Sequence, residues 1–366
     1  MGRLKELFEE CGQSPWLDNI RRGWLTSGEL QTYIDRGVRG LTSNPSIFEK
    51  AIAGSDDYDD QFRELIAGGA SVETSYWELV KHDIEAALAL LRPIYDTSDG
   101  LDGYVSIEVA PDLARETDST YAAAAELWDA IDEPNLLVKI PGTAEGLDAI
   151  QRSIGAGRSI NVTLLFGLQR YGEVIEAYLA GLEDLVAAGG NPHPVASVAS
   201  FFISRVDTEV DRRLDEIGTD EARALKGKAA VANARLAYEL FLDKFSGARW
   251  EALVAKGARV QRPLWASTST KNEAYPDTLY VDTLIGPDTV NTMPDNTIEA
   301  FEDHGTVART VDADFAGDHA AVAALKALGI DLEEVAVRLE EEGVAAFAKS
   351  HDSLLGTLAA KADKLS

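Results

Sequence analysis

The segment Leu136-Leu137-Val138-Lys139-Ile140 combines an apolar run typical of a buried strand with a lysine, a residue that is rarely buried. Burial favours the neutral amine of lysine over its charged form. A neutral amine can attack a carbonyl carbon and form a Schiff base. The alternative is a side chain that reaches the rim of the fold and binds an anion there. The segment therefore predicts a strand and, at Lys139, a nucleophilic amine.

Short apolar runs like this one recur along the chain and alternate with longer amphipathic stretches, which is typical of βα units around a parallel sheet. Eight runs are predicted strands: Ser14–Asp18, Gly37–Thr42, Gly103–Glu108, Leu136–Ile140, Ile160–Leu165, Val195–Phe201, Arg262–Ala266 and Leu279–Ile285. The expected fold class is α/β, a (β/α)8 TIM barrel, because closure of eight strands leaves no exposed sheet edge. An open doubly wound sheet remains an alternative, although no glycine-rich nucleotide-binding fingerprint follows the first strand.

Helical signals fill the intervals between these strands. Asn44-Pro45 supplies a cap residue and a proline at the first helical position. Helices are predicted at Ser46–Ala53, Tyr76–Leu91, Ser119–Ile131, Ala144–Ser153, Gln169–Ala188, Leu332–Lys349 and near Leu354–Lys364. We expect one domain over residues 1–366, with the barrel core at about 14–286 and a helical extension at 287–366 that packs across the barrel.

Composition narrows the functional classes. The 366 residues carry 34 Lys+Arg against 62 Asp+Glu, a net charge of −28 that opposes binding to nucleic acid or to an anionic membrane. The one cysteine, Cys11, cannot form an intrachain disulfide, and the charged start Met1–Gly12 lacks the apolar core of a signal peptide. The five histidines are scattered without a zinc-binding motif. A cytoplasmic protein is expected.

Polar residues fall at or just past the ends of the predicted strands. They are Asp18, Asn44, Glu108, Lys139, Thr163, Ser200 and Ser267. In a parallel barrel the carboxyl ends of the strands converge on one mouth, so residues far apart in the sequence become neighbours around one pocket. The sequence therefore predicts one site built from these side chains.

Six ordered motifs carry a resemblance to a known family. They are Trp16-Leu17-Asp18-Asn19, Gly40-Leu41-Thr42-Ser43-Asn44-Pro45, Ser106-Ile107-Glu108-Val109, Val138-Lys139-Ile140-Pro141-Gly142-Thr143, Asn161-Val162-Thr163-Leu164-Leu165-Phe166 and Ser200-Phe201-Phe202-Ile203-Ser204-Arg205. Together they cover roughly residues 14–285, and the chain resembles the transaldolases of the pentose phosphate pathway.

The resemblance implies a (β/α)8 barrel that forms a lysine Schiff base without a metal or organic cofactor. It implies transfer of a dihydroxyacetone unit from sedoheptulose 7-phosphate or fructose 6-phosphate to glyceraldehyde 3-phosphate or erythrose 4-phosphate. Sugar phosphates are then the expected partners. The sequence leaves monomer and homodimer both open.

The same resemblance implies roles for three catalytic residues. Lys139 attacks the ketose carbonyl, and Glu108 acts through a water as general acid and base in dehydration. Asp18 removes the proton from the hydroxyl beside the cleaved bond. Alternative roles remain open, because Glu108 can be a permanent salt-bridge partner of Lys139 and Asp18 can cap the following turn.

Substrate-binding roles are also implied. Asn161 and Thr163 are expected to hold the water or substrate hydroxyls near Glu108, while Ser200, Phe202 and Ser267 line the pocket. Asn44 is expected to bind substrate, to cap the following helix, or to do both.

An acidic protein that takes sugar phosphates needs local cations. Arg205 suits bidentate phosphate binding, although Asp207 and Glu209 nearby make a surface ion pair the alternative. After the seventh strand the better-known transaldolases carry an arginine. Here the stretch Ala266-Ser267-Thr268-Ser269-Thr270-Lys271-Asn272 is two residues longer and carries lysine. Lys271 is the first candidate for the second phosphate cation, and Arg262 is the substitute.

Two rival functions remain. One is a fructose 6-phosphate aldolase-like enzyme that releases free dihydroxyacetone, but such relatives are much shorter and tend to use a tyrosine as proton relay. The other is a sugar-phosphate-binding barrel without catalysis, which would require an inert Lys139. The presence of Lys139, Glu108 and Asp18 together favours the transferase.

Overall fold

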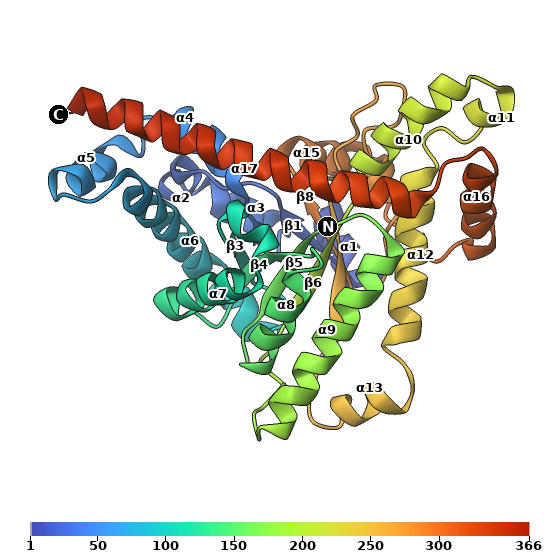
Figure 1. The fold of residues 1–366 in the computed structure, drawn as a ribbon, viewed down its shortest axis with the longest axis horizontal. Coiled ribbons are helices and arrows are strands. Elements are labelled where there is room, and N and C mark those ends of the chain that lie inside the picture. Colours follow the sequence, from blue (N-terminus) through green and yellow to red (C-terminus); the bar gives the residue numbers. More distant parts are fainter. Residues whose placement is uncertain (1, 366) are drawn as a thin grey trace.

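A closed barrel of eight parallel strands forms the centre of the protein (Figure 1). The computed structural model describes residues 2–365. The strands are β1 (Gln13–Leu17), β2 (Leu41–Thr42), β3 (Val105–Glu108), β4 (Leu136–Pro141), β5 (Ile160–Leu165), β6 (Ser197–Phe202), β7 (Gln261–Ala266) and β8 (Thr289–Met293). Every residue of these strands is buried, as expected for a sheet whose outer face is covered by helices. The predicted fold class is confirmed, and the open sheet is excluded.

The first seven predicted strands each overlap an observed strand, but the eighth prediction was wrong. Leu279–Asp282, inside the predicted strand, is the short helix α14, and the last strand is Thr289–Met293. The apolar side chains of this stretch pack into the core from a helical turn: Tyr280, Val281, Leu284 and Ile285 are all buried. The barrel therefore closes at Met293, a few residues beyond the expected end of its core.

Helices surround the barrel in the order of the chain. They are α1 (Arg3–Cys11), α2 (Arg22–Ser27), α3 (Glu29–Arg36), α4 (Pro45–Ala53), α5 (Asp59–Ala67), α6 (Val72–Thr97), η1 (Pro111–Arg115), α7 (Thr117–Ile131), α8 (Gly146–Gly155), α9 (Leu168–Ala187), α10 (Ser204–Ile217), α11 (Asp220–Arg223), α12 (Ala229–Lys244), α13 (Gly247–Val254), α14 (Leu279–Asp282), α15 (Asp295–His304), α16 (Phe315–Ala327) and α17 (Leu332–Leu365). None of the helices described here has the length and apolarity needed to cross a bilayer.

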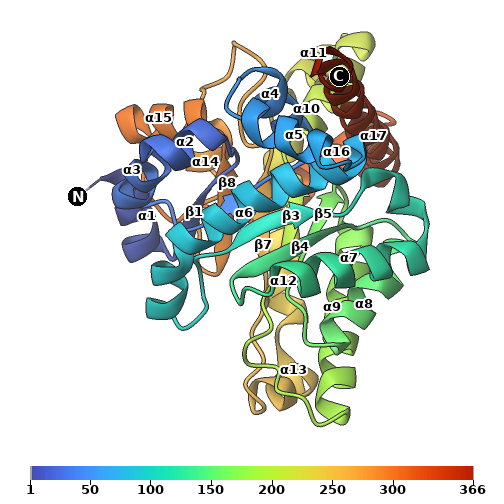
Figure 2. The same cartoon turned by 90° about the vertical axis from the view of Figure 1, so that its left-hand side faces the viewer.

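The C-terminal segment is one continuous helix, whereas two helices were predicted. Figure 1 shows α17 lying across one end of the barrel, and in Figure 2 α13 lies at the opposite end. The polar stretch between the two predicted helices is helical as well, and it packs on α4 and α6. Ser350 shares a hydrogen bond of 2.8 Å with Ser46 of α4, and the buried His351 ring contacts the ring of Tyr76. The predicted packing across the barrel is confirmed.

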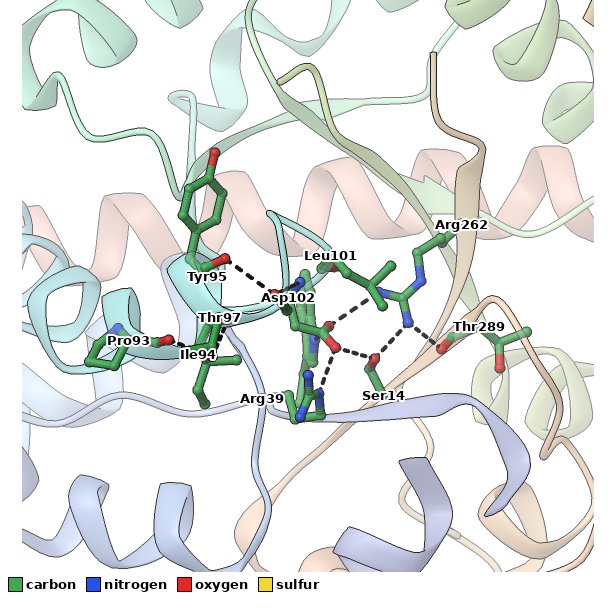
Figure 3. A network of polar contacts seen from close by, with 12 residues as sticks. Ser14, Arg39, Pro93, Ile94, Tyr95, Thr97, Leu101, Asp102, Arg262 and Thr289 are labelled. Carbon is green, nitrogen blue, oxygen red and sulfur yellow. Dashed lines mark hydrogen bonds and ion pairs between the residues drawn. The ribbon is translucent and has the colours of Figure 1, made fainter. Parts of the chain in front are cut away.

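A buried polar cluster closes the amino-terminal end of the barrel (Figure 3). Asp102 is fully buried and accepts hydrogen bonds from Ser14 (2.7 Å), Trp16 (3.0 Å) and Arg39 (2.7 Å). Arg262 also donates to this carboxylate, at 3.1 Å, and to the Ser14 hydroxyl, at 2.6 Å. Arg262 therefore binds Asp102 and Ser14 at the end of the barrel away from the mouth. Its prediction as a substitute phosphate cation was wrong.

We expect Asp102→Ala to lower the free energy of unfolding by about 3–5 kcal/mol, because it leaves buried arginine charge without its partner. Urea denaturation measures this loss. Asp118→Ala is the matched control, since Asp118 pairs with Arg152 at 2.8 Å but is 93% exposed. Its effect should stay below about 1 kcal/mol. Equal losses in the two variants would show that burial does not set the strength of the Asp102 cluster.

Candidate active site

Lys139 and Glu108 form a buried ion pair inside the barrel. They are register partners on the neighbouring strands β4 and β3, so both side chains point to the same face. Lys139 is 4% exposed and Glu108 6%, and the Lys139 Nζ lies 3.0 Å from the Glu108 Oε2. The same Nζ donates a 3.0 Å hydrogen bond to the Ser43 carbonyl oxygen. The predicted strand and the burial of its lysine are confirmed.

Glu108 is held in an environment that disfavours its charge. Burial raises the pKa of this carboxyl, while the charge of Lys139 and the contact with it oppose the shift. Its second oxygen, Oε1, is buried without a hydrogen-bond partner among residues 2–365, and so is the Thr163 hydroxyl. Buried polar atoms of this kind typically bind water or ligand. The pair is thus suited to exchange protons with a bound molecule.

Asp18 follows β1 and lies at the mouth of the barrel. It accepts a 2.7 Å hydrogen bond from the Thr42 hydroxyl. A hydroxyl has one proton to donate, and Thr42 donates its proton to Asp18. In the 2.6 Å hydrogen bond between the Thr42 and Thr292 hydroxyls, Thr292 is therefore the donor. Burial raises the pKa of Asp18, opposed by the Thr42 hydrogen bond and then by the charges of Lys139, Lys271 and Arg205. The carboxylate is thereby oriented and surrounded by cations.

One cavity of about 120 Å³ brings most of the predicted residues together. Its lining includes Asp18, Asn44, Lys139, Thr163, Ser200, Phe202, Arg205 and Ser267. Glu108 is not part of this lining, but it contacts Lys139, which is. A cavity with converging polar groups at the carboxyl ends of barrel strands is typical of an active site. The prediction that these side chains gather at one mouth is confirmed.

Two predicted substrate-binding residues already have protein partners. Asn161 is fully buried, donates 3.0 Å to the Ser106 hydroxyl and accepts 2.8 Å from the Ser200 hydroxyl. It therefore orients Ser200 from beneath the cavity. The Asn44 side-chain oxygen accepts from the Ile47 amide at 3.0 Å, which makes Asn44 the cap of α4 as well as a lining residue.

Arg205 and Lys271 stand where the cavity widens into a groove of about 1110 Å³. Within residues 2–365 neither side chain has an ion pair or hydrogen bond, although Arg205 lies 5.2 Å from the Phe202 ring centroid and 6.0 Å from that of Phe347. Asp207 and Glu209, the alternative partners of Arg205, bind other groups. Burial lowers the pKa of Arg205, and burial together with the charges of Arg205 and Lys50 lowers the pKa of Lys271. These cations are free to bind an anion.

Several contributors were not predicted. Ser43 supplies the carbonyl that binds Lys139, Thr42 and Thr292 orient Asp18, and Phe347 of α17 lines the cavity. Thr42 and Ser43 belong to a motif already singled out in the sequence, so their place beside Asn44 was a usable signal. No spacing in the sequence indicates which residue of α17 lies over the mouth.

Comparison with known proteins places this arrangement in a family. The family model described as "Transaldolase/Fructose-6-phosphate aldolase" matches residues 15–358. The chain belongs to this family. Among proteins called transaldolase, the one from Frankia alni is 51% identical over 358 residues, covering 97% of this chain and 96% of its own.

Other transaldolases are similar over the same extent. That of Thermobifida fusca is 50% identical over 361 residues, 98% of each chain. That of Mycobacterium leprae strain TN is 49% identical over 348 residues, covering 94% of this chain and 93% of its own. The similarity runs through the barrel and most of α17, so the transaldolase resemblance read from six motifs is confirmed over nearly the whole sequence.

Proposed function

We propose that this chain acts as a transaldolase through a Schiff base on Lys139, transferring a dihydroxyacetone unit between sugar phosphates of the pentose phosphate pathway. Transaldolase activity follows from the family and from relatives at about half identity over almost the full length. The observation that carries the proposed mechanism is the buried Lys139, 3.0 Å from Glu108 and sharing one cavity with Asp18.

The first step needs a neutral amine, and the ion pair supplies it. Transfer of one proton from Lys139 to Glu108 yields an uncharged nucleophile and an uncharged acid together, and burial of the carboxyl, which raises its pKa, favours its protonated form. The amine adds to the ketose carbonyl carbon, and one nitrogen proton moves to the carbonyl oxygen. Glu108 then protonates the resulting hydroxyl, which leaves as water and produces the iminium. The unpartnered Glu108 Oε1 and Thr163 hydroxyl support a bound water as the carrier.

The second step breaks a carbon–carbon bond. Asp18 takes the proton from the substrate hydroxyl next to that bond, the bond's electron pair moves into the iminium, and an aldose phosphate leaves. The enamine that remains on Lys139 attacks an acceptor aldehyde in the reverse sense, with Asp18 returning the proton. Asn44, Ser200, Ser267 and Phe202 line the space in which the three-carbon unit is held, and Asn161 fixes Ser200.

The transfer assay tests this function against its rival within the family. Fructose 6-phosphate with erythrose 4-phosphate should give sedoheptulose 7-phosphate, measured by mass spectrometry. Without an acceptor, release of free dihydroxyacetone should be much slower than transfer. Release as fast as transfer would instead assign the chain to the aldolases. No turnover with either substrate set would favour the noncatalytic sugar-phosphate-binding barrel.

The phosphate end of each substrate is proposed to bind Arg205 and Lys271. We expect Arg205→Ala to raise the KM for fructose 6-phosphate by about one to two orders of magnitude, as for loss of a charge-assisted hydrogen bond to an anion. The kcat/KM for unphosphorylated fructose should stay near the wild-type value. Steady-state kinetics with both donors measures the difference. An equal loss for the two donors would contradict the phosphate role.

The proposal also covers the cellular location and the domain organisation of the protein. We propose a cytoplasmic place of action, supported by the single cysteine, which rules out an intrachain disulfide. We also propose that the chain forms one domain, because α17 contacts α4, α6 and β5 and so ties the C-terminal helix to the barrel.

A further inference from the structure

The loop that carries Lys271 runs over residues 268–278, from the end of β7 to α14, beside α10 (Figure 1). Its first residue, Thr268, is fully buried and donates a 2.9 Å hydrogen bond to the Asn291 side chain of β8. Beyond it the loop folds on itself, with Thr270 donating to the Pro276 carbonyl at 3.0 Å. Lys271 lies between these two points and is only partly buried. Its position over the mouth therefore depends on what holds the far side of the loop.

Tyr275 ties that far side to α10. Its hydroxyl donates a 2.6 Å hydrogen bond to Asp211 Oδ2, and the other oxygen of Asp211 accepts from the Gly227 amide at 3.0 Å. The tyrosine ring packs on Gly227, where φ is +70° and a Cβ would lie only 2.9 Å from the ring. Only glycine adopts this backbone and leaves this space without strain. The second tether, between Asp277 and His304 at 2.8 Å, is exposed and so contributes little.

A second tyrosine repeats the connection one turn earlier on α10. Tyr280 donates 2.8 Å to Asp207, which also accepts from the Ala230 amide at 2.8 Å. Burial raises the pKa of Asp207 to about 6. Both carboxylates belong to the helix that begins at Ser204 and carries Arg205 in its first turn. One helix thus presents one cation of the mouth and anchors the loop that presents the other.

We propose that Tyr275 and Asp211 form a clamp that positions Lys271 relative to Arg205, and so sets the affinity for the substrate phosphate. The clamp rests on the proposed phosphate role of these cations. The hydrogen bond from Tyr275 to Asp211 holds the far side of the loop to α10, and this restricts how far Lys271 can move away from the mouth. Tyr275 and Asp211 are positioning residues, because they act through Lys271.

Tyr275→Phe tests the clamp, because it removes the hydroxyl and keeps the ring on Gly227. We expect the KM for fructose 6-phosphate to rise about three- to tenfold, a usual size for one lost hydrogen bond, with kcat unchanged. Kinetics with unphosphorylated fructose should not change. Tyr178→Phe is the matched control, since it removes a 2.8 Å hydrogen bond to the Arg259 carbonyl on another side of the barrel. It should lower the melting temperature without raising either KM.

A double variant tests the clamp separately from the proposed phosphate role of Lys271. In a Lys271→Ala background, Tyr275→Phe should no longer change the KM for fructose 6-phosphate, because the residue it positions is gone. An undiminished effect there, or an equal effect on unphosphorylated fructose, would overturn the clamp. If Lys271→Ala raises this KM and Tyr275→Phe does not, the clamp alone is wrong. If Lys271→Ala leaves it unchanged, the phosphate role of Lys271 in the proposed function is wrong.

Discussion

Lys139→Ala should abolish both turnover and the covalent adduct that borohydride traps when the enzyme meets fructose 6-phosphate. No other lysine lines the cavity of about 120 Å³ among the described residues, so none can replace the lost amine. The fold should survive, because the raised pKa of Glu108 lets this carboxyl take up a proton once its partner is gone. Peptide mapping by mass spectrometry locates the adduct, and circular dichroism checks the fold.

Lys271→Ala is the control for this experiment. It removes a lysine from the mouth and should still yield the adduct on Lys139, at a higher donor concentration. An adduct found on a different lysine in the wild-type protein would refute the assignment of the nucleophile. Turnover retained by Lys139→Ala would refute the Schiff-base mechanism itself.

Asp18→Asn and Glu108→Gln should each slow turnover by about two to four orders of magnitude, as expected for a lost general acid or base. The two variants should stop at different steps. Asp18→Asn keeps an oxygen for the Thr42 hydroxyl and leaves the Lys139–Glu108 pair in place, so the Schiff base should form and accumulate. Glu108→Gln cannot accept the lysine proton or deliver one to the departing hydroxyl, so the Schiff base should form slowly.

Rapid mixing followed by borohydride quenching measures this contrast as the rate and final amount of adduct. Thr42→Val is a graded control, because it removes the 2.7 Å hydrogen bond that orients Asp18 but keeps the carboxylate. It should cost less than Asp18→Asn. If Asp18→Asn delays the adduct as strongly as Glu108→Gln, the division of roles between the two carboxylates is wrong.

The segment Leu136–Ile140 could be predicted as a strand from the sequence because four of its five residues are apolar. The eighth strand could not be predicted, because three of the five residues in Thr289-Val290-Asn291-Thr292-Met293 are polar although all five are buried. Its polar side chains are satisfied inside the barrel, where Thr289 accepts from Gln13 at 2.9 Å and Asn291 accepts from Thr268 at the same distance. Such partners come from distant segments, so a local reading of polarity favoured the neighbouring apolar stretch.

In the candidate site, too, some residues could be predicted from the local sequence and others depended on distant segments. Lys139, Glu108 and Asp18 were predictable because strand ends in a barrel converge, whatever the loops do. Arg262 was misjudged although it is the first residue of the predicted strand Arg262–Ala266, a position that already indicated the end of the barrel away from the mouth. Phe347 was missed because its place over the mouth depends on how α17 packs, and this helix contacts α4, α5, α6, η1, β5 and α10.

The order of these parts along the polypeptide has a consequence for biosynthesis. All side chains assigned to catalysis precede residue 294, whereas Phe347 comes from α17, which the ribosome makes later. We expect a nascent chain that has closed its barrel to carry Lys139 in a cavity that still lacks Phe347 from its lining. Until α17 docks, we expect solvent to reach an adduct on Lys139 more readily and to hydrolyse it, so efficient transfer between sugars should require this last helix.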